Sequence, residues 1–81
     1  MVMKPNKISS ITKKICLKIK LERLKRNLSQ EQLAELSGIS KNAIGKIERV
    51  EVSPTIESLE KIAKAFNMDF AQLIDISKVE L

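Results

Sequence analysis

The chain has 81 residues and a net charge of +5, and 43% of its residues are hydrophobic. A chain of this length buries one modest core at most, so we expect a single domain for which partners or oligomerisation matter. With no histidine and a single cysteine, Cys16, it lacks the commonest general base and excludes an intramolecular disulfide and a multi-cysteine metal site. We therefore expect a protein that is not an enzyme and that uses no cofactor and no metal.

Positive charge is concentrated at the start of the chain. Residues 1–26 hold nine Lys or Arg against one Glu, a net charge of +8, whereas residues 51–81 hold three against six acids, a net charge of −3. This asymmetry favours a polyanionic partner for one side of the molecule, and a plainly solvated surface is the alternative. No apolar stretch approaches the ~20 residues of a membrane span, and the start does not read as a secretion signal. We expect a cytoplasmic protein with no membrane partner.

The first predicted helix begins near Ser9 or Ser10 and ends at Arg26. Asn27 follows it and suits the left-handed conformation that terminates helices. At helical spacing the apolar residues form two nearly opposite faces. One is an isoleucine face and the other a leucine face: Ile8, Ile11, Ile15 and Ile19 against Leu17, Leu21, Leu24 and Leu28. A helix with two apolar faces is either packed on both sides or presents one face to a partner.

The second and third predicted helices are joined by a short turn. Ser29 and Gln32 form a capping box that begins the second helix. Gly38, which takes a positive φ at no steric cost, ends it. Ser40 caps the third helix, which covers residues 41–49. The residues expected to pack this corner on the core are Leu33, Leu36, Ile39, Ile44 and Ile47.

Two more helices complete the pattern. Thr55 caps a fourth helix over residues 56–66, and Asp69 with Gln72 forms a capping box for a short fifth helix. Their expected inward residues are Leu59, Ile62, Ala63 and Phe66 in the fourth helix and Phe70, Leu73 and Ile74 in the fifth.

The predicted fold is all-α, because no stretch shows a useful strand-like alternation of apolar and polar residues. We expect a compact five-helix domain over residues 11–76, with a central helix-turn-helix. A basic N-terminal tail over residues 1–10 precedes it, and a C-terminal tail over residues 77–81 follows it.

The turn around Gly38 indicates a function. Ala34 is small where the second and third helices cross, and Gly38 permits a tight turn between them. The third helix therefore projects from the surface. A helix is about as wide as the major groove of B-DNA, and its N-terminal residues can reach base edges there. The pattern therefore favours double-stranded DNA as the partner.

The chain resembles the Cro/lambda-repressor-like helix-turn-helix proteins, also called the XRE type. The residues that carry the resemblance are LSQEQLAELSGIS (28–40), IGKIER (44–49), SPTIESLEKIAKAF (53–66) and FAQLI (70–74). The resemblance covers roughly residues 15–75. It implies a sequence-specific transcriptional regulator that reads operator half-sites as a dimer, of the kind found among restriction-modification controller proteins and small phage or plasmid repressors.

The resemblance also assigns roles to individual residues. Gln30 would contact a phosphate from the start of the second helix, and Arg49 would lie near the DNA backbone at the end of the third. Arg23, also counted among the DNA-binding candidates, and Glu48 match an ion pair between the first and third helices. The groove-facing positions of the third helix are Ser40, Lys41, Asn42, Gly45 and Lys46.

The side chains at two of these positions suit base recognition. Asn42 can pair bidentately with adenine, and Lys46 can donate to guanine. Without the motif, both would be read as solvated polar residues. Gly45 has two readings, tolerated drift or close approach of the backbone to DNA.

Three residues depart from the pattern of the family. Glu22 stands where the family usually has an apolar residue, and Val50 where it often has glycine, so the exit turn of the third helix must differ or be strained. Glu51 is acidic in a loop that often approaches phosphate. These departures put the loop contacts in doubt and leave the expected fold unchanged.

Two other functions remain open. The leucine face could serve a protein partner, as in an antitoxin whose DNA binding is secondary. Residues 8–26 taken alone suggest a basic amphipathic helix on an anionic membrane, although apolar residues on both faces argue against it.

The expected homodimer has two candidate interfaces. One is the C-terminal segment, where Ile76, Val79 and Leu81 would form an exposed apolar patch if left bare. The other is the leucine face, which ranks second because Lys14 and Lys20 on its borders would bring like charges together.

Overall fold

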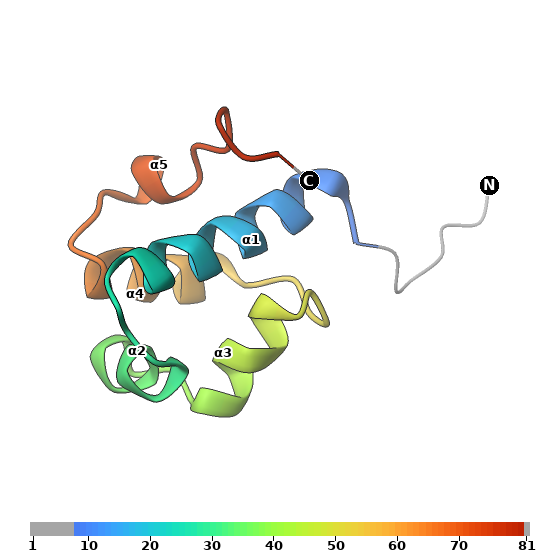
Figure 1. Ribbon diagram of the computed structural model, residues 1–81. Helices are drawn as coiled ribbons and strands as arrows, with labels where there is room; N and C mark the ends of the chain where they lie inside the picture. Colours follow the sequence, from blue (N-terminus) through green and yellow to red (C-terminus); the bar gives the residue numbers. More distant parts are fainter. Residues whose placement is uncertain (1–7, 81) are drawn as a thin grey trace.

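In the computed structural model, which describes residues 8–80, every predicted helix is present and no strand occurs within that range. The helices are α1 Ser10–Lys25, α2 Gln30–Ser37, α3 Lys41–Glu48, α4 Ile56–Ala65 and α5 Phe70–Leu73. Figure 1 shows α1 crossing the molecule, with α2 and α3 on one side of it and α5 on the other. The basic tail with Lys4 and Lys7 and the interface candidate Leu81 lie outside the described residues.

The helices begin at the predicted caps. The hydroxyl oxygens of Ser9, Ser29, Ser40 and Thr55 each accept a hydrogen bond from the backbone N–H three residues later, at 3.0–3.1 Å. Gln32 completes a capping box by accepting from the Ser29 N–H at 2.8 Å, and Gln72 accepts from the Asp69 N–H at 2.9 Å. These bonds satisfy N–H groups that a helix leaves free in its first turn.

Three helices end in the same left-handed turn. The second residue after each of these helices has a positive φ, at Asn27 (56°), Val50 (59°) and Asn67 (56°). The N–H of the following residue then bonds to the carbonyl five residues before it. At α3 this bond runs from the Glu51 N–H to the Lys46 oxygen at 2.8 Å. The exit turn of α3 thus keeps the usual geometry, and because valine is β-branched its conformation there is strained.

The core forms where all five helices meet. Its buried hydrophobic residues are Cys16, Ile19, Leu33, Ile44, Ile47, Leu59, Ile62, Ala63, Phe66 and Leu73. The inward residues predicted for α4 are confirmed, as is the positive φ of Gly38, at 74°.

The prediction that Leu36 packs on the core is wrong, because its side chain is 59% exposed and Ser37 is buried instead. Successive residues of a helix are about 100° apart, so Leu33 and Ser37 share one face whereas Leu36 points to its edge.

The two apolar faces of α1 differ in how far they are buried. Cys16, Ile19 and Arg23 face the core, and burial raises the pKa of the Cys16 thiol above its ordinary value. On the leucine face, Leu21 and Leu24 are 48% and 49% exposed. Helix α1 therefore packs against α3 and α5, and Leu21 and Leu24 of its leucine face reach the surface.

Glu22, one departure from the family pattern, belongs to a polar clamp between α1 and α4. Its carboxylate lies 2.6 Å from Arg26 Nη1, while Arg26 Nη2 donates to the Phe66 carbonyl at 3.1 Å and the guanidinium lies over the Phe66 ring. Burial raises the pKa of Glu22, but the hydrogen bond from Arg26 and the nearby Lys25 outweigh it and hold that pKa below its ordinary value. An ion pair thus replaces apolar packing at this position.

Candidate DNA-binding surface

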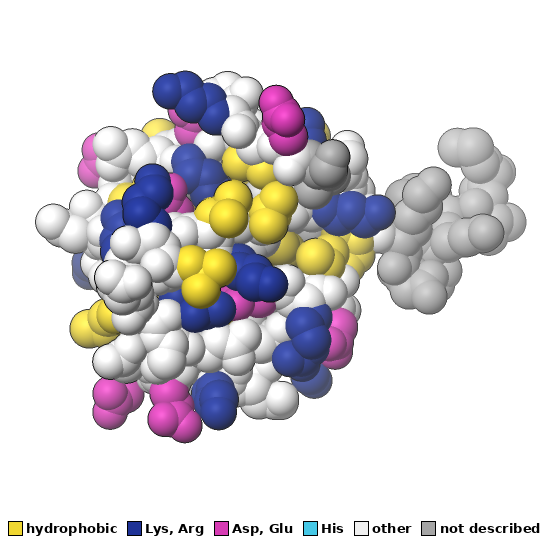
Figure 2. All heavy atoms as spheres, in the orientation of Figure 1, with side chains coloured by type: hydrophobic (Ala, Val, Ile, Leu, Met, Phe, Trp, Pro, Cys, Tyr) yellow, Lys and Arg dark blue, Asp and Glu magenta, His cyan; other side chains and the backbone are white. Residues whose placement is uncertain are grey.

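Helix α3 is fixed to the core by one face and leaves the other free. Ile44 and Ile47 are buried, whereas Lys41, Asn42 and Lys46 are exposed. Figure 2 shows Lys and Arg side chains over the region of α3. Three of the predicted groove-facing residues therefore lie together on one outer surface. The hydroxyl of Ser40, which stands at the start of that surface, accepts from the Ala43 N–H at 3.1 Å and so acts as the helix cap.

Arg23 and Glu48 form the predicted ion pair. Arg23 Nε lies 2.7 Å from Glu48 Oε2, and Arg23 Nη2 lies 2.9 Å from Glu48 Oε1. Arg23 Nη1 also donates to the Leu28 carbonyl at 2.7 Å. The hydrogen bond to Glu48 raises the pKa of Arg23 above its ordinary value, although burial opposes this. Since both side chains are largely buried, the pair joins α1 to α3 beneath the exposed surface, and Arg23 does not lie with the exposed candidates.

Gln30 extends this network to the surface. Its Nε2 donates to Glu48 Oε1 at 3.2 Å from the first residue of α2, and its side chain is half-buried. The carboxylate of Glu48 thereby accepts bonds from side chains on two helices. The start of α2, where the resemblance places a phosphate contact, is held against α3.

Gly45 makes room for the side chain of Arg49. It is buried, and a Cβ at this position would lie 2.9 Å from Arg49 Nη1 and 3.6 Å from Gln30 Oε1. Arg49 and Gln30, both expected to contact the DNA backbone, therefore converge over the same glycine. This space for a neighbouring side chain is a third explanation of the glycine, beside tolerated drift and close approach of the backbone to DNA.

Two acidic residues near this surface form ion pairs that the sequence did not predict. Glu51 pairs with Arg49 Nε, and Glu31 Oε1 lies 3.5 Å from Lys41 Nζ. All four side chains are well exposed. The sequence signal for the Arg49–Glu51 pair is their separation by two residues. That separation predicts an ion pair only when the turn at Val50 is known.

Other kinds of site find no support in the part of the chain that the structure describes. Residues 8–80 contain no cluster of three or more side chains suited to a metal ion, and each buried side-chain nitrogen or oxygen there has a hydrogen-bond partner. None of the helices between residues 8 and 80 is both long enough and apolar enough to cross a membrane.

Known proteins are similar to this chain in sequence. The control protein C.SmaI of Serratia marcescens is 48% identical over 48 residues, which are 59% of this chain and 57% of that protein. The cryptic phage CTXphi transcriptional repressor RstR of Vibrio cholerae is 34% identical over 64 residues, which are 79% of this chain and 58% of that protein. The chain thus spans less than two thirds of these two curated relatives, one a control protein and the other a transcriptional repressor.

A solved structure matches over a larger share of its length. The crystal structure of the wild-type restriction-modification controller protein C.Esp1396I has a TM-score of 0.76 at 34% identity, over 86% of this chain and 96% of that one. The helix-turn-helix family model HTH_3 matches residues 19–73, which is more than half of the chain and includes α2, α3 and α4. The chain therefore belongs to HTH_3, the XRE-type helix-turn-helix family.

Proposed function

We propose that this protein regulates transcription by binding double-stranded DNA with α3 in the major groove. The observation that carries the proposal is the exposed row of Lys41, Asn42 and Lys46 on a helix held by a buried ion pair. A rigidly held helix positions donor groups against base edges without further ordering of the protein.

The side chains on this surface divide into two roles. Asn42 and Lys46 would read bases, Asn42 by pairing with adenine and Lys46 by donating to guanine. Gln30 and Arg49, which converge over Gly45, would contact phosphates on one side of the groove. Residues 11–76 would form the binding domain. Because the proposed partner is DNA and the thiol of Cys16 is free, we place the protein in the cytoplasm.

The relatives narrow the class of regulator. A control protein, a restriction-modification controller and a phage repressor are all similar to this chain. We propose that it acts in the same way, on a short operator, as a controller protein or a small repressor.

We propose further that the protein binds as a homodimer, because one helix-turn-helix reads too few base pairs to specify a site. Of the C-terminal patch expected from the sequence, Ile76 and Val79 are half-buried, and Leu81 lies outside the described residues. In contrast, Leu21 and Leu24 are about half exposed, and Figure 2 shows hydrophobic side chains grouped over α1. The exposed apolar area therefore favours an interface centred on the leucine face.

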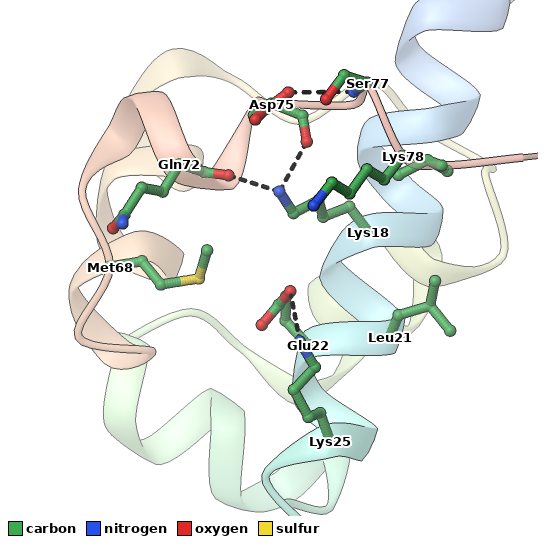
Figure 3. A pocket seen from close by; sticks show the side chains of 10 residues that line it. Lys18, Leu21, Glu22, Lys25, Met68, Gln72, Asp75, Ser77 and Lys78 are labelled. Atoms are coloured by element: carbon green, nitrogen blue, oxygen red, sulfur yellow. Dashed lines mark hydrogen bonds and ion pairs between the residues drawn. The ribbon is translucent and has the colours of Figure 1, made fainter.

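The two candidate interfaces are neighbours. Leu21 on α1 and Val79 in the C-terminal segment line one pocket of about 580 Å³ (Figure 3). Lys18, which also lines this pocket, donates to the carbonyls of Gln72 and Asp75 at 2.6 and 2.7 Å and so ties α1 to the C-terminal segment. A second copy can cover the leucines and the pocket together, although Lys14 and Lys20 still border the leucine face.

Selection of bound duplexes from a random DNA pool tests the proposed function. We expect enrichment of a short sequence in two related halves, with centres about 10 base pairs or one helical turn apart. Recovery of unselected sequences at all salt concentrations would contradict it. If the protein instead neutralises a protein partner, as an antitoxin does, the exposed leucines are the surface that would serve, and the DNA selection would yield only weak enrichment.

A further inference from the structure

Arg49, the expected phosphate contact at the end of α3, is already engaged in the protein without DNA. Its Nε bonds to the carboxylate of Glu51, and its Nη1 lies over Gly45 next to the Gln30 side chain. The guanidinium is thus paired with a carboxylate, and it occupies the space that the missing side chain of Gly45 leaves open.

The turn after α3 explains why Glu51 reaches this position. Val50 adopts a positive φ of 59°, and the Glu51 N–H bonds to the Lys46 carbonyl at 2.8 Å, while the Val50 N–H bonds to the Ile47 carbonyl at 3.0 Å. These bonds fold the chain back over the last turn of α3. The backbone of Glu51 is therefore fixed, and its carboxylate is presented to Arg49.

We propose that Glu51 limits DNA affinity by competing with phosphate for Arg49. This inference rests on the proposed DNA binding and adds a residue that tunes it. A phosphate that approaches Arg49 must replace the Glu51 carboxylate, and it also meets a negative charge fixed beside the site. At physiological salt the Debye length is about 8 Å, so both effects act only near Arg49.

Competition between Glu51 and phosphate leaves sequence recognition unchanged. A phosphate contact carries no base information, so the competition lowers the affinity for every duplex by the same factor. Glu51 therefore sets the general strength of binding, while the exposed row on α3 sets the choice of sequence.

A double-mutant cycle on Glu51 and Arg49 tests the inference. The variants are Glu51→Gln, Arg49→Gln and the combination, and the probes are a fluorescein-labelled duplex selected from the random pool and a scrambled duplex of equal length. Glu60→Gln is the matched control, because Glu60 is exposed on α4 and forms no ion pair within residues 8–80. Circular dichroism confirms that each variant is folded.

We expect Glu51→Gln to lower the Kd for both duplexes by about two- to fivefold, the strength of an exposed ion pair. In the Arg49→Gln background, Glu51→Gln should change the logarithm of the Kd by less than half as much. Glu60→Gln should leave the Kd unchanged. An equal gain with and without Arg49 would overturn the competition, since charge repulsion alone would then explain it. No gain in either background would overturn it as well. Failure of the unmodified protein to bind either duplex at low salt would instead contradict the proposed function itself.

Discussion

Glu48 joins α3 to α1 and α2 through hydrogen bonds. Its two carboxylate oxygens accept three hydrogen bonds, two from Arg23 and one from Gln30. The group is buried, so its charge is balanced by these donors and not by water. A carboxylate in this situation stabilises the fold only as long as its cation is present.

Removal of either member of the Arg23–Glu48 pair should destabilise the protein strongly. We expect Arg23→Met or Glu48→Leu alone to lower the free energy of unfolding by about 3–5 kcal/mol, because the remaining charge is left buried without its counterion. The double variant should lose clearly less than the sum of the two single losses. Urea denaturation of the four proteins measures the coupling. Coupling close to zero would show that the pair does not hold α3 to α1.

Gly45→Ala should separate stability from binding. Alanine favours the helix over glycine by about 1 kcal/mol, and the added Cβ comes too close only to Nη1 at the end of the long Arg49 side chain, which can shift, so the protein should become more stable by up to that amount. The displaced Arg49 should then bind DNA phosphate less well. Thermal denaturation and duplex titration of the same sample check both effects. An increase in stability with unchanged affinity for DNA would support the reading of Gly45 as tolerated drift.

At the level of whole elements, the strained turn after α3 gives a direct stability prediction. A left-handed conformation costs an ordinary residue about 1–2 kcal/mol, whereas asparagine tolerates it and occupies the equivalent places at Asn27 and Asn67. Val50→Asn also loses the contacts of a half-buried valine. We expect a net stabilisation of about 0.5–1 kcal/mol by chemical denaturation.

Val52→Asn serves as the control for this change. Val52 is 39% exposed and does not have a positive φ, so the same substitution there relieves no strain. It should be neutral or slightly destabilising. If both variants lose the same stability, the conformation of Val50 is not strained.

The elements themselves could be predicted because their signals are local. The caps at Ser29 and Ser40, the glycine at 38 and the spacing of apolar residues in α4 lie within a few residues of what they determine. The exposure of Leu36 was missed because it depends on how α2 is rotated against its neighbours. For the same reason, the sequence could not decide whether the leucine face packs inside the molecule or lies on its surface.

The candidate site was predictable only in part. The exposed row on α3 follows from helical spacing, and the Arg23–Glu48 pair followed from the family resemblance. The space above Gly45 and the Arg49–Glu51 pair depend on side-chain conformations and on the turn at Val50, which spacing alone does not determine.

At the scale of the whole molecule, the leucine face should govern self-association. We expect the intact protein to sediment as a dimer at micromolar concentration, and the double variant Leu21→Ser, Leu24→Ser to sediment as a monomer, because half-exposed leucines lose their apolar contact. Ile56→Ser is the control, since Ile56 is 62% exposed on α4 and does not belong to the leucine face.

Two results would contradict this prediction in different ways. A monomeric intact protein would overturn the dimer itself. A double variant that remains dimeric would move the interface away from the leucine face, and a version of the chain ending at Asp75 then tests the C-terminal segment.

The central claim is that α3 reads DNA sequence, and titration of the selected and scrambled duplexes with Asn42→Ala and Lys46→Ala tests it most directly. Lys61→Ala, an exposed lysine on α4, is the control. We predict that each α3 variant loses about 1–3 kcal/mol of binding free energy on the selected duplex and little on the scrambled one, because only base contacts are removed. Equal losses on both duplexes would contradict the claim and place the sequence-reading residues elsewhere.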